Sequence, residues 1–338
     1  MKRRVAGISE RDVMKLPRRQ FLHLAAGAAA LPTVSRVTWA QAYPTRPVRI
    51  IVGQAAGSGS DIAARLLGQR LSERLGQPFI IDNRPGAGSN IATEAVVRAP
   101  ADGYTLLLVG SFNAVNATLY DKLNFNFIRD VAPVATLYYA PNVMAVHPSF
   151  PAKTILEFIA YSKSNPGKVN MGSGTTGATV HMSGELFKIM AGIDMVPVPY
   201  RGAGPALTDL LAGQVQVSFP TMPASIEYIR TGKLRALAVT TAKRSEALPG
   251  IPTVGEFLPG YEASNWYGVG IPKNTPAEII DKLNKEINAG LADPKMKPRL
   301  ADFGGTPLVG SPADFGKLIA DETEKWAKVI RAANIKPE

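Results

Sequence analysis

From Val48 onward, short runs of apolar residues alternate along the chain with stretches whose apolar residues recur at helical spacing. Such alternation predicts an α/β fold in which a parallel sheet is covered by crossover helices. Ser60 or Asp61 is expected to cap the first helix, and Ser89 the second. In the first part of the chain the pattern predicts strands at 48–52, 79–81 and 104–109 and helices at 61–75 and 89–98.

After Pro141 the same pattern starts again and predicts a second α/β unit. Its predicted strands and extended segments are 142–146, 168–171, 196–200 and 234–239, and its predicted helices are 155–163, 180–190 and 206–211. The last third adds helices at 277–291 and 312–333 but no further alternating unit, so we expect it to return to the first one. The prediction is therefore two lobes joined by two chain crossings, an arrangement that closes on a ligand by hinge motion.

The N-terminus has the three parts of an export signal in the expected order. Arg18 and Arg19 form a twin-arginine pair, an apolar stretch follows at 21–31, and Ala40 to Ala42 is an A-x-A cleavage site. A buried amphipathic helix is the alternative, but a run of small residues before Pro32 is poor core material. We therefore expect residues 1–42 to be a twin-arginine-type signal peptide that is cleaved after Ala42.

Charge and composition exclude several kinds of site and partner. The chain has a formal charge of +11, but residues 1–42 hold eight of its 38 Lys and Arg and two of its 27 Asp and Glu, so the remaining 296 residues carry +5. This modest charge does not call for a nucleic-acid partner and is compatible with the gathering of small anions. The absence of cysteine excludes disulfides, thiolate metal sites and a cysteine nucleophile. After residue 42 no apolar run approaches the roughly 18 residues of a membrane span.

Four loops made of small and hydroxyl residues follow predicted strands. They are 57–61, 86–90, 110–113 and 172–177. Ligands of open α/β sheets bind at the carboxyl ends of strands, where small residues and helix N-termini expose backbone N–H groups to an anion. The simplest ligand implied is a small carboxylate, although each loop taken alone is also an ordinary turn or cap.

One of these loops also fits a dinucleotide motif. Residues 172–177 match G-x-G-x-x-G between a strand and a helix, and Asp194 lies 22 residues after the first glycine. This leaves an exported oxidoreductase as an alternative function. The sequence otherwise lacks G-x-S-x-G, Walker A and histidine metal motifs, and it shows no acid and base pair. We therefore expect no catalytic residues, no cofactor and no metal.

Taken together, several segments resemble the Bug family, the extracytoplasmic solute-binding receptors of tripartite tricarboxylate transporters. The resemblance spans essentially all of 43–338. It implies a two-lobed periplasmic binding protein of type II, a Venus flytrap, that holds a carboxylated molecule and has no catalytic activity. The segments that carry the resemblance are 43–49 (YPTRPVR), 82–88 (DNRPGAG), 101–106 (ADGYTL), 172–174 (GSG), 199–202 (PYRG), 233–239 (KLRALAV), 248–256 (LPGIPTVGE) and 266–268 (WYG).

By position in these loops, the resemblance gives eleven expected ligand contacts. They are Ser58, Ser60, Asp61, Ser89, Ser111, Asn113, Ser173, Thr175, Thr176, His181 and Tyr200. The expected lobes are 43–143 with 267–338, and 144–266. Two departures from the family pattern fall on the expected cleft wall: the first loop is 53–58 (GQAAGS) without Pro or aromatic residues, and Phe219 is followed by Pro220 and Thr221 instead of an acid.

The resemblance also implies partners and a location. We expect a monomeric periplasmic protein that binds a monocarboxylate or dicarboxylate, possibly aromatic, and passes it to membrane permease subunits. An uncharged, hydroxyl-rich wall would tolerate a second carboxylate or an aromatic acid. A ligand-sensing module for a membrane signalling partner shares this fold and stays open as a further alternative.

Overall fold

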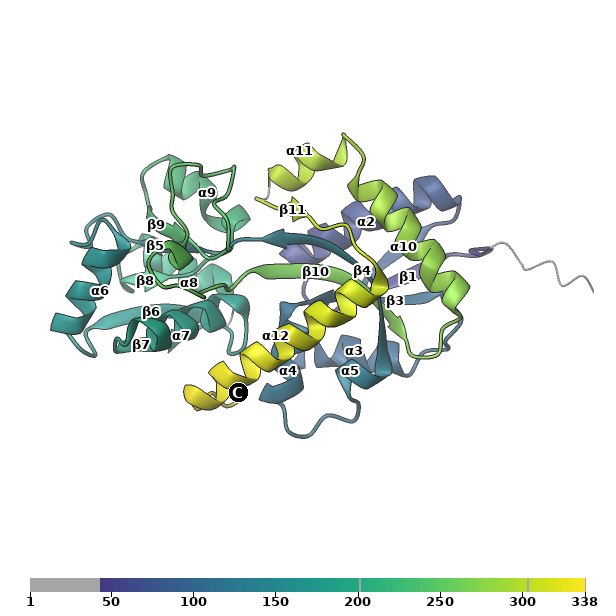
Figure 1. Cartoon of the computed structure of the whole chain (residues 1–338), viewed down its shortest axis with the longest axis horizontal. Helices are drawn as coiled ribbons and strands as arrows, with labels where there is room; N and C mark the ends of the chain where they lie inside the picture. Colours follow the sequence, from purple (N-terminus) through teal and green to yellow (C-terminus); the bar gives the residue numbers. More distant parts are fainter. Residues whose placement is uncertain (1–42, 201, 303, 338) are drawn as a thin grey trace, which may run out of the picture. The chain divides into compact units, whose positions relative to one another are not determined.

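The computed structural model describes residues 43–200, 202–302 and 304–337 (Figure 1). The predicted signal peptide and its cleavage site lie outside these residues. Within the described ranges the strands form two mixed sheets. The first sheet has the order β11 (Thr306–Pro307), β4 (Val131–Ala140), β10 (Asn265–Pro272), β3 (Thr105–Gly110), β1 (Val48–Val52) and β2 (Phe79–Asn83). The second has the order β7 (Met195–Pro199), β6 (Val169–Gly174), β8 (Val217–Ser218), β5 (Val143–Val146) and β9 (Arg235–Val239).

Helices from three parts of the chain surround these sheets. Those before β4 are α2 (Gly59–Leu75), α3 (Asn90–Val97), α4 (Ser111–Leu119) and α5 (Phe127–Asp130). Those between β5 and β9 are α6 (Ile155–Ser164), α7 (Thr179–Ala191), α8 (Ala203–Leu211) and α9 (Met222–Arg230). The last group is α10 (Ala277–Leu291), α11 (Met296–Ala301) and α12 (Pro312–Ala332), and short 3₁₀ turns occupy Ala87–Ser89 and Val254–Glu256.

The sheets are mixed, so the prediction of a parallel sheet was wrong in part. Strands β1, β2 and β3 are parallel, as expected, but β10 runs antiparallel to both β3 and β4. The reason is the return of the chain. Because β10 enters the first sheet at the edge where β3 ends, it has to run in the opposite direction to β3.

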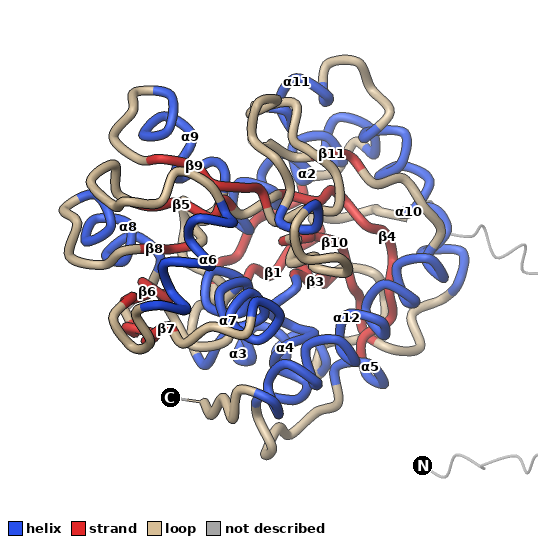
Figure 2. The backbone as a smooth tube through the Cα atoms, turned by 60° about the vertical axis from the view of Figure 1, so that its left-hand side comes forward, coloured by secondary structure: helices blue, strands red, loops and turns tan. Residues whose placement is uncertain are grey.

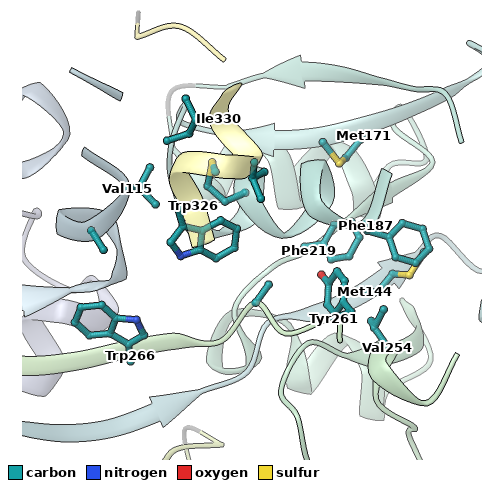
Figure 3. Close-up of a cluster of buried hydrophobic side chains, with 14 of the residues drawn as sticks. Val115, Met144, Met171, Phe187, Phe219, Val254, Tyr261, Trp266, Trp326 and Ile330 are labelled. Carbon is teal, nitrogen blue, oxygen red and sulfur yellow. The ribbon is translucent and has the colours of Figure 1, made fainter. Parts of the chain in front are cut away.

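Strands β1 and β3 are buried on both faces, and alternate residues serve different cores. Ile50 and Leu106 belong to a cluster under α2 and α10, whereas Ile51 and Leu107 belong to a cluster on the opposite face. That second cluster is continuous from the first sheet into the second (Figure 3), and its members include Val115, Trp266, Trp326, Phe187 and Phe219. The two sheets therefore share one packed core across α12.

Helix starts differ from prediction in an informative way. Helix α2 begins at Gly59, because Ser58 is extended and its Oγ accepts the Asp61 N–H at 3.3 Å, so neither Ser60 nor Asp61 is the cap. Ser89 does precede α3, but with φ +80° its side chain makes no capping bond. Segment 110–113 was expected to be a loop, whereas α4 starts at Ser111 directly after β3.

Candidate functional site

The carboxyl ends of the parallel strands lie at one edge of each sheet, and the chain crossings join these two edges. Strand β4 ends at Ala140 beside Asn265, where β10 begins, and only Pro141 and Asn142 separate it from β5. At the other sheet Val143 of β5 pairs with Val239, where β9 ends. We call residues 53–61, 83–90, 110–116 and 265 the first edge, and residues 172–178, 200 and 218–221 the second edge (Figure 2).

A threonine ties the two crossings together. The backbone N–H of Asn142 donates to Thr240 Oγ1 at 2.9 Å, and the Thr240 N–H returns a bond to the Asn142 carbonyl at 3.0 Å. Both residues are fully buried. The Asn142 side chain also donates to Ser183 Oγ of α7 at 3.1 Å. The junction of the edges is therefore fixed by polar contacts inside the core.

At the first edge, the loop from β1 to α2 is organised by Asp61. Its Oδ2 accepts the Gly57 N–H at 2.9 Å and Arg65 Nε at 2.8 Å, and the residue is only 2% exposed. Burial opposes ionisation, but the hydrogen bonds from Arg65 and Gly57 outweigh it and lower the pKa of Asp61. The loop therefore carries a fixed negative charge that Arg65 partly balances.

Deeper in the first edge, α4 and the start of β10 are joined by side-chain hydrogen bonds. Ser111 Oγ donates to Asn265 Oδ1 at 2.9 Å, and Asn265 Nδ2 donates to the Tyr267 hydroxyl at 2.8 Å. Burial raises the pKa of Tyr267 to about 12, so this hydroxyl is neutral. Asn113 accepts the Gly110 N–H at 2.9 Å and donates to Thr93 at 3.0 Å.

Ser89 holds the second glycine-rich loop against the first. Its Oγ donates to the Gly53 carbonyl at 2.9 Å, and its positive φ turns the chain into α3. The approach is so close that a Cβ on Gly53 would lie 2.3 Å from Ser89 Cβ. Ser89 is only 5% exposed, so it shapes this edge through packing.

The second edge is built mainly from backbone. Ser173 Oγ donates to the Val198 carbonyl at 3.0 Å and thereby joins β6 to β7. In the following turn Thr175 is exposed and Thr176 is half-buried. His181, in the first turns of α7, accepts the Gly177 N–H on Nδ1 at 3.2 Å, and its Nε2 lies 3.8 Å from Glu185. His181 thus holds the loop from the inside.

Tyr200 closes the second edge beside β7. Its hydroxyl donates to Asp209 of α8 at 2.6 Å, and the ring is half-buried. Burial, together with the hydrogen bond and charge of Asp209, raises the pKa of Tyr200 to about 12. The hydroxyl is therefore neutral, and the ring is fixed between β7 and α8 at this edge.

The two edges touch at Gly177. This residue has φ +78°, and a Cβ placed on it would lie 2.6 Å from Leu119 Cδ2 and 3.4 Å from Val115 Cγ1 of α4. Because the positive φ and this close approach both favour glycine, the loop of the second edge rests directly on α4. The N-termini of α2, α3 and α4 belong to the first edge, and that of α7 follows Gly177 at the second edge, so both edges offer backbone N–H donors.

Ten of the eleven expected contact residues lie at these two edges and His181 follows in the first turns of α7, but they divide by accessibility. Ser58, Thr175, Thr176 and Tyr200 have accessible or half-accessible side chains. The other seven are buried, and hydrogen bonds to protein atoms occupy their side chains; they are Ser60, Asp61, Ser89, Ser111, Asn113, Ser173 and His181. The protein's own hydrogen bonds therefore position these seven side chains, and their contact with a ligand stays a prediction.

Two residues of the first edge escaped the sequence analysis. Asn265 and Gln54 both carry hydrogen bonds that organise the edge. Asn265 begins β10 at the predicted return crossing, and Gln54 stands in the loop that departs from the family pattern. Both could have been proposed from these positions in the sequence.

The dinucleotide alternative does not fit the topology. Asp194 directly precedes Met195, which pairs with Val169 at the start of β6, so it lies at the amino edge of the second sheet. A ribose-binding acid has to close its strand at the carboxyl edge, beside residues 172–177. In the described part of the chain no three His, Cys, Asp or Glu side chains gather as metal ligands. None of the helices described there has both the length and the apolar character to span a bilayer.

Solved structures share this architecture over nearly the whole described chain. A structure from R. palustris with adipate superposes with a TM-score of 0.79 at 38% identity, covering 88% of this chain and 100% of that one. MatC from Rhodopseudomonas palustris, with bound malate, gives 0.75 at 31% identity, with 85% and 100% covered. The periplasmic binding protein BugD gives 0.76 at 32%, with 88% and 100% covered.

Sequence comparisons agree with the structural ones. Protein BugT of Bordetella pertussis is 38% identical over 300 residues, which is 88% of this chain and 92% of the relative. The family model described as tripartite tricarboxylate transporter family receptor matches residues 63–335. The family consists of solute-binding receptors, and its solved members are periplasmic binding proteins. The chain therefore belongs to the tripartite tricarboxylate transporter receptor family, as the resemblance of its motifs to Bug proteins predicted.

Proposed function

We propose that this protein captures a carboxylated small molecule between its two edges in the periplasm and delivers it to the permease subunits of a tripartite transporter. The observation that carries the proposal is the contact of the second edge with α4 at Gly177, between the helix starts of the first edge (α2, α3 and α4) and that of α7 at the second. Backbone N–H groups at helix starts bind carboxylates without a salt bridge. The related proteins with adipate and malate support a dicarboxylate as the ligand.

The experiment is a thermal-shift screen with a panel of monocarboxylates and dicarboxylates that includes adipate and malate. A ligand at 100 times its Kd stabilises the folded protein by about 2.7 kcal/mol, which corresponds to a rise in Tm of roughly 5 °C for a chain of this size. If no carboxylate in the panel shifts the Tm, the proposed function is wrong.

A matched pair of variants locates the binding site. Thr175→Trp places a bulky ring on the exposed turn of the second edge and should abolish the shift. Thr231→Trp makes the same change at another exposed threonine, which follows α9 and leads to the amino end of β9, and should keep the shift. Equal shifts in both variants would remove the second edge from the site. A bulky residue at Ser89 or Ser173 is less informative, since both are buried and their replacement disturbs the fold.

Export and delivery need their own measurements. The proposal includes a twin-arginine signal cleaved after Ala42, so the protein purified from the periplasm should begin at Tyr43, and light scattering should give a monomer. Delivery predicts that cells lacking the permease lose uptake of the ligand found in the screen. Uptake that persists, together with loss of a transcriptional response, would indicate a sensing partner instead.

A further inference from the structure

Gln54 lies at the first edge, two residues after Val52, the last residue of β1, and hydrogen bonds fix both its backbone and its side chain. Its backbone carbonyl accepts Asn83 Nδ2 at 3.0 Å, and its side-chain Oε1 accepts Ser60 Oγ at 2.9 Å. Ser60 is fully buried, whereas Gln54 itself is half-buried. The oxygen side of the amide therefore points into the protein, and the accessible part of the residue belongs to the edge.

The orientation of this amide is set by its bond to Ser60, whose Oγ donates to Gln54 Oε1 at 2.9 Å. Ser60 lies beside the side-chain network of the first edge, because it is also hydrogen-bonded to Tyr267. In that network Ser111 donates to Asn265 Oδ1 at 2.9 Å, and Asn265 Nδ2 donates to the Tyr267 hydroxyl at 2.8 Å. The Gln54 amide oxygen is thus held as an acceptor at the end of this network.

Because Oε1 accepts from Ser60, the nitrogen of the Gln54 amide is left as the donor. Over the ranges that the structure describes, no protein group is hydrogen-bonded to Gln54 Nε2. We infer that Gln54 is a specificity-determining residue whose Nε2 donates a hydrogen bond to an oxygen at the far end of the ligand, so that the site prefers dicarboxylates to monocarboxylates. The inference rests on the proposed function and deepens it.

The preference has a simple physical origin. A second carboxylate accepts the oriented N–H and stays solvated by a polar wall, whereas the methyl end of a monocarboxylate covers that donor without bonding it. A site built to hydrogen-bond a group discriminates against the analogue that lacks the group, because its own polar atom is then left unpaired. The amide carries no charge, so it also avoids the cost of burying an ion.

The test uses pairs of acids with equal carbon number: adipate with hexanoate, glutarate with valerate, and succinate with butyrate. Affinities are measured by calorimetry for wild-type protein and for Gln54→Met, which has similar length but no donor. We expect the wild type to prefer the dicarboxylate of its tightest pair by at least tenfold. Gln54→Met should reduce that ratio by about tenfold, since hydrogen bonds to charged groups are worth this much.

A second variant tests the sign of the interaction. Gln54→Glu still accepts from Ser60 but presents a negative oxygen, so it should weaken the dicarboxylate more than Gln54→Met does and change the monocarboxylate least. Gln69→Met is the matched control, because Gln69 lies on the exposed face of α2 and bonds only to Glu73 among described residues. The control should keep the wild-type ratio.

The outcomes separate the two proposals. If no acid of any pair binds the wild type, the proposed function fails. If the acids bind, but the wild type shows no preference or Gln54→Met keeps it unchanged, the inference about Gln54 is overturned while the receptor function stands. A preserved Tm in Gln54→Met, measured without ligand, shows that the loss of the ratio comes from recognition and not from unfolding.

Discussion

The two edges of the site have related topology but present their polar groups in different ways. At the first edge, buried side chains such as Ser111, Asn265 and Asn113 bond to one another and to backbone. At the second edge, the turn around Gly177 presents mainly backbone, together with the exposed Thr175 and the half-buried Thr176. One edge is organised by a side-chain network and the other by backbone conformation.

This difference indicates which changes each edge tolerates. In a network, the loss of one member leaves a buried partner unpaired, so substitutions cost stability even when they remove little volume. In a glycine turn, the backbone angle and the space above it matter more than any single hydrogen bond. Stability experiments should therefore separate the edges by the kind of substitution that harms each.

The largest effect is expected at Gly177, where the edges touch. Gly177→Ala places a Cβ 2.6 Å from Leu119 and also forces alanine to φ +78°. The angle costs about 1 kcal/mol and the overpacking about 1–3 kcal/mol, and the displaced turn should lower ligand affinity at least ~tenfold. Urea unfolding and calorimetric titration measure the two losses.

Gly192→Ala is the control for the backbone angle. Gly192 has φ +60° at the end of α7, and a Cβ there meets nothing within 4 Å. Gly192→Ala should lose only the stability that the backbone angle costs, and it should keep the wild-type affinity for the ligand. Leu119→Ala, added to Gly177→Ala, should cost less stability than the sum of the two single changes, because it removes the clash. Equal losses in Gly177→Ala and Gly192→Ala would show that the contact between the edges carries no energy.

A smaller loss of stability should distinguish Ser111, which belongs to a network of side chains, from Ser173, which bonds to a backbone carbonyl. Ser111→Ala leaves the Oδ1 of the buried Asn265 without its donor and should lower the free energy of unfolding by about 1–3 kcal/mol. Ser173→Ala removes a bond to the half-buried Val198 carbonyl, which water can replace, and should cost about 0.5–1 kcal/mol. Denaturant unfolding compares them, and a larger loss for Ser173→Ala would reverse the comparison.

Much of the fold was predictable because its signals are local. Helix α10 has the predicted bounds, since Leu283 and Ile287 repeat on one buried face. Strand β1 likewise matches its apolar run. The signals of β10 were hidden by its own glycines: a Cβ on Gly268 would lie 2.2 Å from the Phe315 ring, and one on Gly270 would lie 2.5 Å from Val131. These glycines make room for packing, although in sequence they resemble a turn.

The positions of the candidate loops were predictable, but the accessibility of their side chains was not. Small residues after strands marked the edges described above, since their position follows from the α/β alternation. Which side chains are accessible at these edges depends on partners far away in sequence. Ser111 is bonded to Asn265, 154 residues later, and this partner decides that Ser111 is buried. No local pattern contains such information.

The smallest expected effects concern pH, and they have opposite signs at the two edges. At the first edge, hydrogen bonds lower the pKa of Asp61, so its contribution to stability is present above the unfolded pKa near 4 and is lost as the pH falls below it. At the second edge, the pKa of Tyr200 is raised to about 12, so its contribution is complete below about pH 10 and is lost as the pH rises toward 12.

Each of these contributions can be isolated by comparing wild type with a variant in which the group cannot titrate. Between about pH 5 and pH 3, wild type should lose more unfolding free energy than Asp61→Asn, which cannot titrate. Between about pH 10 and pH 12, wild type should lose more than Tyr200→Phe, although other buried tyrosines make both curves fall. The same denaturant series over pH measures all three proteins. If Tyr200→Phe instead fell in parallel with wild type above about pH 10, the alkaline loss would come from other tyrosines and would lie outside the second edge.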